Sequence, residues 1–309
     1  MAAWLDPSKE TGLIAELGEL LERAGLSHRS DVKAILKDGK DALVALGQFD
    51  GRSAVFKVYR SEDAAKLVEN SVAALMRYGA RLDWLGSAVV QVLASSPASG
   101  LLVMEEAQGT QASRLPDRLD VDQAAHMRRA ARWLTQCAGS DTVERGFAPN
   151  KSLRPLEDYI QGRDPLAAEC TDLLNSLKSQ RPALRGHPLI WGPTHGDFAP
   201  VNLVDDGRCL IAFDVQGVPT LPLIKVAAHF LVARDFKRAI TQPLQWGLDA
   251  QTTRDFLQEF ENQIVVDTLA IRFFVGHAML RRLLFDSFKG KGRENAKVRA
   301  QHYLQDLRE

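Results

Sequence analysis

Three oxygen-bearing side chains near the middle of the chain have types and spacing that suit chemistry on a phosphate. The segment 195–202 reads His-Gly-Asp-Phe-Ala-Pro-Val-Asn, so Asp197 is followed, after four intervening residues, by Asn202. Asp214 lies twelve residues after Asn202. The residues 205–208 have turn composition and 209–213 are strand-like, so Asn202 and Asp214 are expected at opposite ends of a hairpin, where they can converge.

Phosphoryl transfer explains why these residue types would be selected. The reaction needs in-line positioning and charge neutralisation more than covalent help. A carboxylate must accept or orient the proton of the acceptor hydroxyl, and hard oxygen ligands must hold magnesium on the phosphates. Asp197 fits the first role, and Asn202 with Asp214 fits the second. A single Asp or Asn in a loop is usually a turn former, so the prediction depends on the whole set.

The phosphates also need a cation, which a lysine on an upstream strand can supply. Lys57 lies in the last of three strand-like runs, and Glu69 on the following helix is its expected ion-pair partner. The alternative for Lys57 is a solvated lysine on the strand surface. The alternative for Glu69 is an exposed carboxylate of the helix. His195 is expected to be a buried residue that hydrogen-bonds the loop rather than a proton carrier.

The elements that must position these residues have an α+β order in the first hundred or so residues, a usual domain size. Two Asp-Gly turns join three strand-like runs, which predicts an antiparallel meander. Alternation in the third run places Lys57 on one face and Phe56 on the other. We expect helices over 6–25 and 64–78, and strands over 32–36, 42–46, 53–59, 88–93 and 101–104.

The remainder of the chain is mostly helical. We therefore expect an N-terminal nucleotide-binding lobe over 1–107 and a C-terminal helical catalytic and acceptor-binding lobe over 108–309. The expected helices cover about 120–137, 156–177 with a break at 162–165, 223–239, 252–261 and 265–288, followed by a final charged one, with a mixed segment over 190–214.

Composition excludes several classes of protein. The 309 residues include 39 Lys plus Arg and 39 Asp plus Glu, so the net charge is zero and neither nucleic acid nor an anionic membrane is an expected partner. Three scattered cysteines indicate neither a disulfide framework nor a zinc site. Asp214 and two prolines interrupt the most apolar stretch, 209–233, so it cannot be a membrane span. No signal peptide is evident at the N-terminus, and we expect a cytoplasmic protein.

The sequence His-Gly-Asp-x4-Asn, with Gly196 where protein kinases have arginine, resembles the aminoglycoside phosphotransferase and choline kinase family of small-molecule kinases. The resemblance covers most of the chain, from about Val32 to the C-terminal helices. It implies an α+β, two-lobed, protein-kinase-like fold, in which a small N-terminal lobe has an antiparallel sheet plus a helix and a larger C-terminal lobe is mostly helical. It implies that Asp197 is the catalytic base, next to His195 in the catalytic loop.

The same resemblance implies the binding residues. Asn202 and Asp214 become magnesium ligands, and Lys57 becomes the phosphate-binding lysine with Glu69 as its partner. The segment 102–109 is similar to the family's hinge, which implies the following assignments. Met104 lines the adenine pocket, and the backbones of Glu105 and Ala107 hydrogen-bond the base; the turn 37–41 occupies the place of the nucleotide-covering loop.

One segment departs from the family pattern. Family members usually have, after the metal aspartate, a segment ending in Asp-Leu-Ala. This chain has Pro-Leu-Ile-Lys-Val-Ala at 222–227, with Lys225 or Val226 in the place of that aspartate.

These observations predict a kinase that transfers the γ-phosphoryl of ATP, with Mg²⁺, to a hydroxyl of a small acceptor. The alternative is a nucleotide-binding pseudokinase with a regulatory role, which only the Lys225 segment favours. A protein kinase is disfavoured because the chain has no Gly-x-Gly-x-x-Gly loop and no Ala-Pro-Glu. The sequence does not identify the acceptor or the oligomeric state. It also leaves open whether ATP or GTP is the donor. Arg281 and Arg282 are interpreted as a solvated helix end or as contacts to an anionic substrate.

Overall fold

The computed structural model describes residues 6–82, 86–161, 168–215, 217–286 and 290–308. Within this part the chain forms two compact units. The first unit comprises Met1–Trp84, Ala88–Gly109 and Ile211–Val218, and the second comprises Leu85–Ser87, Thr110–Leu210 and Pro219–Glu309. The short segment that carries Asp214 therefore belongs to the first unit, although it follows most of the second along the chain.

The first unit is built on a five-stranded antiparallel sheet with the order β1-β2-β3-β6-β5. Its strands are β1 (Ser30–Asp38), β2 (Ala42–Phe49), β3 (Arg52–Tyr59), β5 (Val92–Ser96) and β6 (Leu101–Glu105). Asp50 and Gly51 form the two-residue link between β2 and β3, both with positive φ, 50° and 73°. A type I′ hairpin turn needs this conformation at both positions, so the Asp-Gly signal in the sequence is confirmed here.

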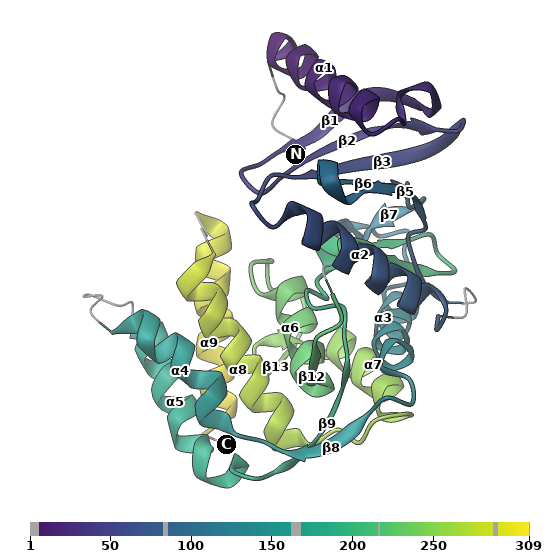
Figure 1. Ribbon diagram of the computed structural model, residues 1–309. Helices are drawn as coiled ribbons and strands as arrows, with labels where there is room; N and C mark the ends of the chain where they lie inside the picture. Colours follow the sequence, from purple (N-terminus) through teal and green to yellow (C-terminus); the bar gives the residue numbers. More distant parts are fainter. Residues whose placement is uncertain (1–5, 83–85, 162–167, 216, 287–289, 309) are drawn as a thin grey trace. The chain divides into compact units, whose positions relative to one another are not determined.

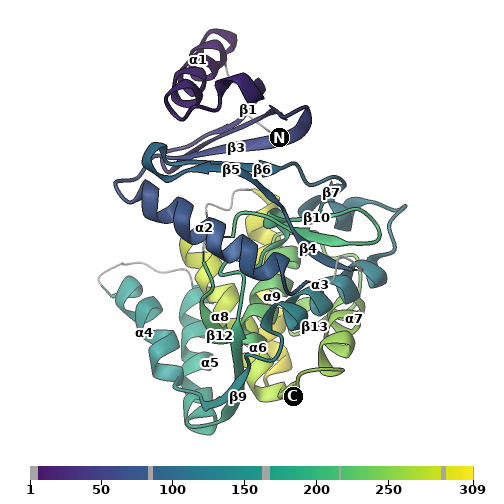
Figure 2. The same ribbon diagram turned by 45° about the vertical axis from the view of Figure 1, so that its right-hand side comes forward.

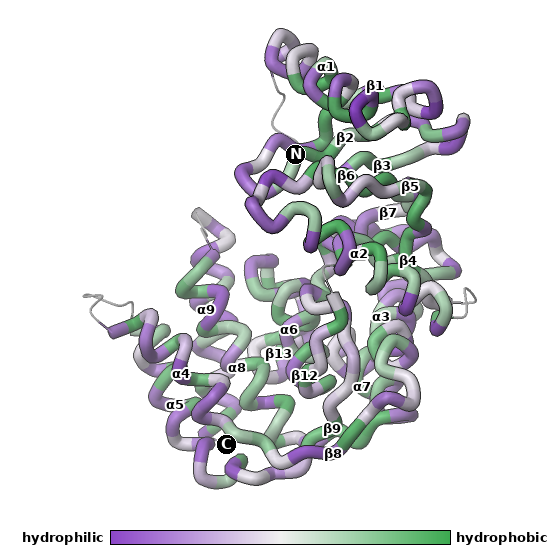
Figure 3. Tube along the Cα trace, viewed as in Figure 1, coloured by the Kyte–Doolittle hydropathy of each residue, from purple (hydrophilic) through white to green (hydrophobic). Residues whose placement is uncertain are grey.

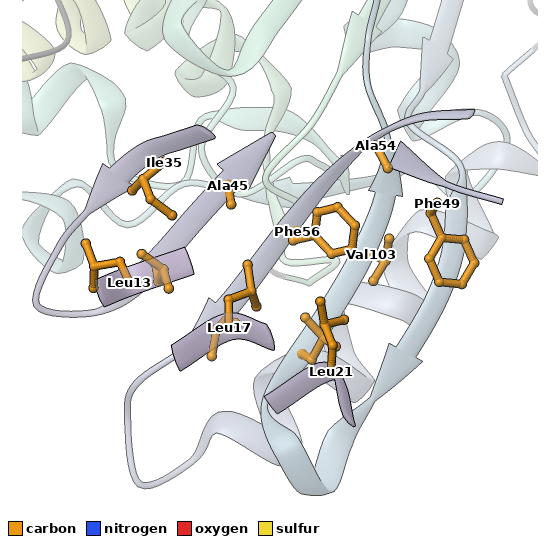
Figure 4. Close-up of a cluster of buried hydrophobic side chains, with 12 residues drawn as sticks. Leu13, Leu17, Leu21, Ile35, Ala45, Phe49, Ala54, Phe56 and Val103 are labelled. Atoms are coloured by element: carbon orange, nitrogen blue, oxygen red, sulfur yellow. The ribbon is translucent and has the colours of Figure 1, made fainter. Parts of the chain in front are cut away.

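One helix covers each face of this sheet (Figure 2). Helix α1 (Pro7–Arg23) starts at Asp6, whose side chain accepts a hydrogen bond from the Ser8 amide at 3.1 Å. Hydrophilic and hydrophobic residues alternate along α1 (Figure 3). Its inner leucines, Leu13, Leu17 and Leu21, form a buried cluster with sheet residues that include Ile35, Phe49, Ala54, Phe56 and Val103 (Figure 4).

Helix α2 (Ala64–Gly79) packs against the opposite face of the sheet, where the Tyr59 and Ser71 hydroxyls are hydrogen-bonded at 2.9 Å. Phe56 points into the α1 cluster, whereas Lys57, its neighbour on β3, lies on the α2 side with Tyr59. The alternation predicted for this strand is confirmed, and it directs the Lys57 side chain away from the main apolar cluster.

The strand expected over 88–93 is wrong, because this run is divided between two sheets. Strand β4 (Ser87–Val89) lies beside β11 (Leu210–Ala212), and the Val90 amide donates to the Ala212 carbonyl at 3.1 Å. Strand β5 pairs instead with β6. Apart from Gln91 the run is apolar, so its composition predicts a single strand rather than a change of partner.

The second unit is mostly helical, as expected. Its helices are α3 (Gln123–Ala138), α4 (Pro149–Ile160), α5 (Ala168–Leu184), α6 (Leu223–Asp235), α7 (Ala250–Glu261), α8 (Thr268–Phe285) and α9 (Lys291–Asp306). Helices α5, α8 and α9 lie side by side, and α8 also packs against α6 (Figure 1). Helix α8 is central, with an unbroken run of buried residues from Phe273 to Leu280.

Short strands complete the second unit. A three-stranded antiparallel sheet has the order β12-β9-β8, and β7 pairs with β10 and β13 with β14. The strands are β7 (Thr110–Gln111), β8 (Val143–Gly146), β9 (Pro188–Pro193), β10 (Leu203–Asp205), β12 (Thr220–Pro222), β13 (Leu244–Gln245) and β14 (Leu248–Asp249).

A buried polar network joins three parts of the second unit. The Arg299 guanidinium, which is fully buried, pairs with Asp249 at 2.9 Å and donates to the Gly247 carbonyl at 3.1 Å. The Asp249 amide in turn donates to Asp235 at the end of α6 at 3.1 Å. Because buried charges need such partners, the network anchors the C-terminal end of α6 to α9.

The state of the cysteines and the character of the helices bear on two expectations from the sequence. Each of the three cysteines is a buried thiol in the structure. None of the described helices has the length and apolar character needed to cross a lipid bilayer.

Candidate functional site

Asp197 and Asn202 are held together in the loop after β9. Asn202 is buried in a short 3₁₀ turn (Pro200–Asn202), and its Nδ2 donates to both the Asp197 carbonyl and the Asp197 carboxylate Oδ2, each at 2.9 Å. The Asp197 side chain is exposed, yet its orientation is fixed by this contact. The two hydrogen bonds also orient Asn202, because its amide oxygen must point away from Asp197.

His195 also holds this loop in place, through its buried ring. It is buried, and its Nδ1 accepts a hydrogen bond from the Asp197 amide at 3.4 Å. The Trp133 ring of α3 lies 5.8 Å from the His195 ring, measured between centroids. This placement suits a residue that positions the loop, as the sequence predicted, rather than one that meets a substrate.

Gly196 gives the loop a conformation that other residues adopt only with strain. Its φ is +88°, and a Cβ at this position would lie 3.3 Å from Pro219 Cγ. The Thr194 amide donates to the Pro219 carbonyl at 2.9 Å, which ties the loop to the chain before β12. The local backbone conformation therefore explains why the residue between His195 and Asp197 is glycine.

Asp205 anchors the far end of the motif and was missed by the sequence analysis, which read it as a turn residue. It is buried, with His126 Nδ1 at 2.7 Å and Arg129 Nη2 at 2.8 Å from its Oδ2. Burial opposes ionisation, but the hydrogen bonds from His126, Arg129 and the Gly207 amide outweigh it and lower the pKa of Asp205. The available signal was the spacing of His126 and Arg129, which places both on one face of a helix.

In the first unit the structure brings Lys57 and Asp214 together. Lys57 is buried, its ammonium group forms an ion pair with Asp214 Oδ1, and its Nζ lies 4.5 Å from the centre of the Tyr59 ring. Asp214 has a positive φ of 58°, which is uncommon outside glycine. Two of the predicted residues, 157 positions apart, are thus in direct contact.

The ion pair expected between Lys57 and Glu69 is not formed. Among the residues that the structure describes, Lys57 pairs with Asp214, whereas Glu69 is exposed on α2 and has no ionic partner. The buried side of α2 includes Val68 and Ser71, and Glu69 projects beside this stripe rather than toward β3. A role for Glu69 in nucleotide binding stays a prediction.

The predicted hinge begins in β6. Met104 is buried, and its neighbours on the adjacent strands are Val55 and Val92. The Glu105 amide donates to the Gln91 carbonyl at 2.9 Å, so only the Glu105 carbonyl is left to accept from a ligand. Ala107 is half-buried and makes no hydrogen bond within the described part of the chain.

A cavity of about 680 Å³ adjoins the Asp197 loop within the second unit. Helices α4, α6 and α8 form its other walls. Four basic side chains line it: Lys151, Lys225, Arg281 and Arg282. From the sequence, Lys225 was noted as a departure from the family pattern, and Arg281 and Arg282 were interpreted either as a solvated helix end or as contacts to an anionic substrate.

Two histidines join the walls of this cavity. The Nε2 of His229 lies 3.4 Å from Nδ1 of His277, and the Nε2 of His277 lies 3.1 Å from the Ser152 carbonyl. Burial, followed by the positive charge of Lys225, lowers the pKa of His277 to about 4. Burial, with the neighbouring His277, also lowers the pKa of His229 well below its ordinary value. Both rings are therefore neutral near pH 7.

The two candidate metal ligands fit a hard cation. No cluster of three or more His, Cys, Asp or Glu suited to a metal occurs among the described residues. Taken singly, the amide oxygen of Asn202 and the carboxylate of Asp214 are hard oxygen donors of the kind that Mg²⁺ prefers. The fixed amide of Asn202 supports this assignment, because its Oδ1 makes no hydrogen bond to any described residue.

The model of the phosphotransferase enzyme family matches residues 32–214, from β1 to Asp214. No curated protein matches the sequence.

Solved structures share the fold at low sequence identity. A choline/ethanolamine kinase family protein from Mesorhizobium loti is 14% identical with a TM-score of 0.62, over 96% of this chain and 95% of that one. Aminoglycoside phosphotransferase APH(4)-Ia is 15% identical with a TM-score of 0.62, over 93% and 98% of the two chains. Aminoglycoside 2'-phosphotransferase-IIIa is 11% identical with a TM-score of 0.65, over 94% and 98%. The fold is thus the kinase-like one expected, and the chain belongs to the phosphotransferase enzyme family.

Proposed function

We propose that this protein is a kinase that transfers the γ-phosphoryl of ATP to a hydroxyl of a small acceptor, with Mg²⁺ as its cofactor. The observation that carries the proposal is the Asp197 carboxylate, which is exposed, held by Asn202 and located at the wall of a cavity large enough for a sugar-sized molecule. A general base needs this combination of access to the substrate and fixed orientation.

Asp197 would act through the carboxylate oxygen that Asn202 does not use. Oδ2 accepts the hydrogen bond from Asn202, whereas Oδ1 makes none within the described residues. An acceptor hydroxyl would donate to Oδ1, and its oxygen would form a bond to the γ-phosphorus. The bond from that phosphorus to the bridging β–γ oxygen would break, ADP would leave, and the hydroxyl proton would pass to Asp197.

The first unit would bind the nucleotide. The Glu105 carbonyl and the Ala107 amide offer an acceptor and a donor two residues apart, which suits the edge of adenine, and Met104 would line its face. Lys57 would release Asp214 and bind the phosphates instead. Glu69 would then be the ion-pair partner of Lys57. Asn202 and Asp214 would hold Mg²⁺, whose charge when bound offsets that of the triphosphate.

The names of similar structures support these ligand classes. Structures of related proteins are named as complexes with GDP, with AMP-PNP and hygromycin B, and with AMP-PNP and Ca²⁺. Those names concern the other proteins, but they favour a nucleotide, a divalent cation and a small-molecule acceptor for this one.

ADP release against a library of hydroxylated metabolites tests the proposal, with ATP and GTP compared as donors. We expect acceptor-dependent release with wild type and a loss of at least about a hundredfold with Asp197→Ala. Equal release by both proteins with every acceptor would contradict the catalytic role of Asp197. Tight nucleotide binding without turnover would instead favour the pseudokinase alternative.

A further inference from the structure

The cavity beside Asp197 has a marked excess of positive charge. Four of its described lining residues are lysine or arginine, and Asp197 is the only carboxylate among them. If Asp197 is the base, as proposed above, then no described lining residue remains to neutralise a cationic group on the acceptor.

The basic side chains come from two packed helices that present them to the same space. Lys225 and His229 lie one turn apart on α6, and His277 and Arg281 lie one turn apart on α8. The contact of 3.4 Å between the two histidines joins the helices at this level. Lys225 and Arg281 therefore each lie one helical turn from the histidine pair, and both line the cavity.

Most of this charge is not compensated within the protein. Arg282 is paired with Asp286 at 2.7 Å. Lys151, Lys225 and Arg281 form no ion pair with any described residue. Burial, followed by the positive charge of Arg281, lowers the pKa of Lys225. Half-buried Lys225 and exposed Arg281 thus repel each other across the cavity wall, an arrangement that an anion would relieve.

We infer that the acceptor is an anion: a hydroxylated small molecule with a carboxylate or phosphate group that Lys225 and Arg281 bind while its hydroxyl lies at Asp197. The inference rests on the proposed kinase activity for the role of Asp197. A volume of about 680 Å³ leaves room for a sugar-sized acceptor of this kind. Arginine can bind both carboxylates and phosphates through two parallel hydrogen bonds, so the two anion types are separate arms of the test.

The test measures binding first, because binding does not depend on turnover. Isothermal titration of the full-length protein would compare D-gluconate and glycerol 3-phosphate, as hydroxylated anions, with glucose, choline and kanamycin, as neutral and cationic molecules. We expect an anion to bind more tightly than the others, and its affinity to fall as salt is added.

Charge-neutralising variants then locate the site. Lys225→Gln and Arg281→Gln should each weaken binding of the preferred anion by at least about tenfold. Arg281 is exposed, so its variant is expected to fold even if the half-buried Lys225 variant does not. Arg154→Gln is the matched control, because Arg154 is an exposed arginine of α4 that pairs with Asp158 and does not line the cavity.

ADP release with the same molecules separates this inference from the kinase proposal. In the two variants we expect KM to rise for the anionic acceptor and to stay unchanged for the nucleotide. Tighter binding of choline or kanamycin, no binding of either anion, or equal anion affinity in wild type and Arg281→Gln would overturn the inference. Anion binding that depends on Lys225 and Arg281, but without ADP release, would overturn the kinase proposal and leave the anion site standing.

Discussion

Asn202 donates two hydrogen bonds of 2.9 Å to Asp197, one to its backbone carbonyl and one to its carboxylate. One amide group therefore fixes both the main chain and the side chain of the candidate base. The same contact turns the Asn202 oxygen toward the other side, where it can serve a metal. The positions of the proposed base and of one proposed metal ligand are thus coupled through a single side chain.

Asn202→Ala should remove this coupling. We expect kcat to fall by about a hundredfold or more, because the Asp197 carboxylate loses its orientation and the cation loses a ligand. Steady-state kinetics over a range of Mg²⁺ concentrations would measure the change. A variant whose kcat and Mg²⁺ requirement match those of wild type would exclude both roles.

Asp214→Ala should leave the buried Lys57 ammonium without its partner. Since the Asp214 side chain is about a third exposed, we expect a loss of about 1–3 kcal/mol in the free energy of unfolding. The double variant Lys57→Met with Asp214→Ala should be more stable than Asp214→Ala alone, because it removes the unpaired charge. Urea denaturation of wild type, the double variant and the single variants Asp214→Ala and Lys57→Met would check this order, and additive losses would argue against a significant ion pair.

Asp214→Ala should also weaken nucleotide binding in a metal-dependent manner. If Asp214 is a metal ligand, affinity for ATP should fall much more in Mg²⁺ than in EDTA. Titrations of both proteins under the two conditions would measure the difference, and an equal loss in both would contradict the metal role.

Gly196→Ala should reduce both stability and turnover. The substitution forces a side chain into a positive-φ conformation and against Pro219, at a cost of about 1–2 kcal/mol. We expect kcat to fall while KM for the nucleotide changes little. Gly186→Ala is the matched control, because Gly186 also has a positive φ, of 75°, but has nothing within 4 Å of the added Cβ. Comparable kcat values in the two variants would show that the Gly196 position has no special part in catalysis.

His277 should make the protein less stable in acid. Its pKa is about 4 in the folded protein against an ordinary value of 6.5, so the unfolded chain binds the proton more readily. The contribution of neutral His277 to the free energy of unfolding is therefore fully present above pH 6.5. It decreases by up to about 3 kcal/mol as the pH falls toward 4. The depressed pKa of His229 acts in the same direction.

Denaturation at several pH values would test this for wild type, His277→Gln and a control, His28→Gln, in which the histidine is exposed. The pH dependence between 6.5 and 4 should be shallower in His277→Gln and unchanged in the control. The same slope in all three proteins would assign the acid sensitivity to other groups.

Much of the fold and part of the site could be predicted from the sequence, where the deciding interactions are local. The Asp50-Gly51 turn follows from the few residues that tolerate two positive φ angles, and the direction of Lys57 follows from strand alternation. The contact between Asp197 and Asn202 spans five positions of one loop, so it depends on local structure, although the sequence analysis assigned the two residues separate roles.

Tertiary structure alone decided the partners that come from distant parts of the chain. Lys57 pairs with Asp214 rather than Glu69 because the orientation of α2 is set by its apolar stripe, which leaves Glu69 exposed. The basic cavity assembles Lys151, Lys225 and Arg281 from three helices, and none of these residues is near another in sequence. Hydrophobic packing places those helices, and the charge pattern of their facing surfaces appears only once they are packed.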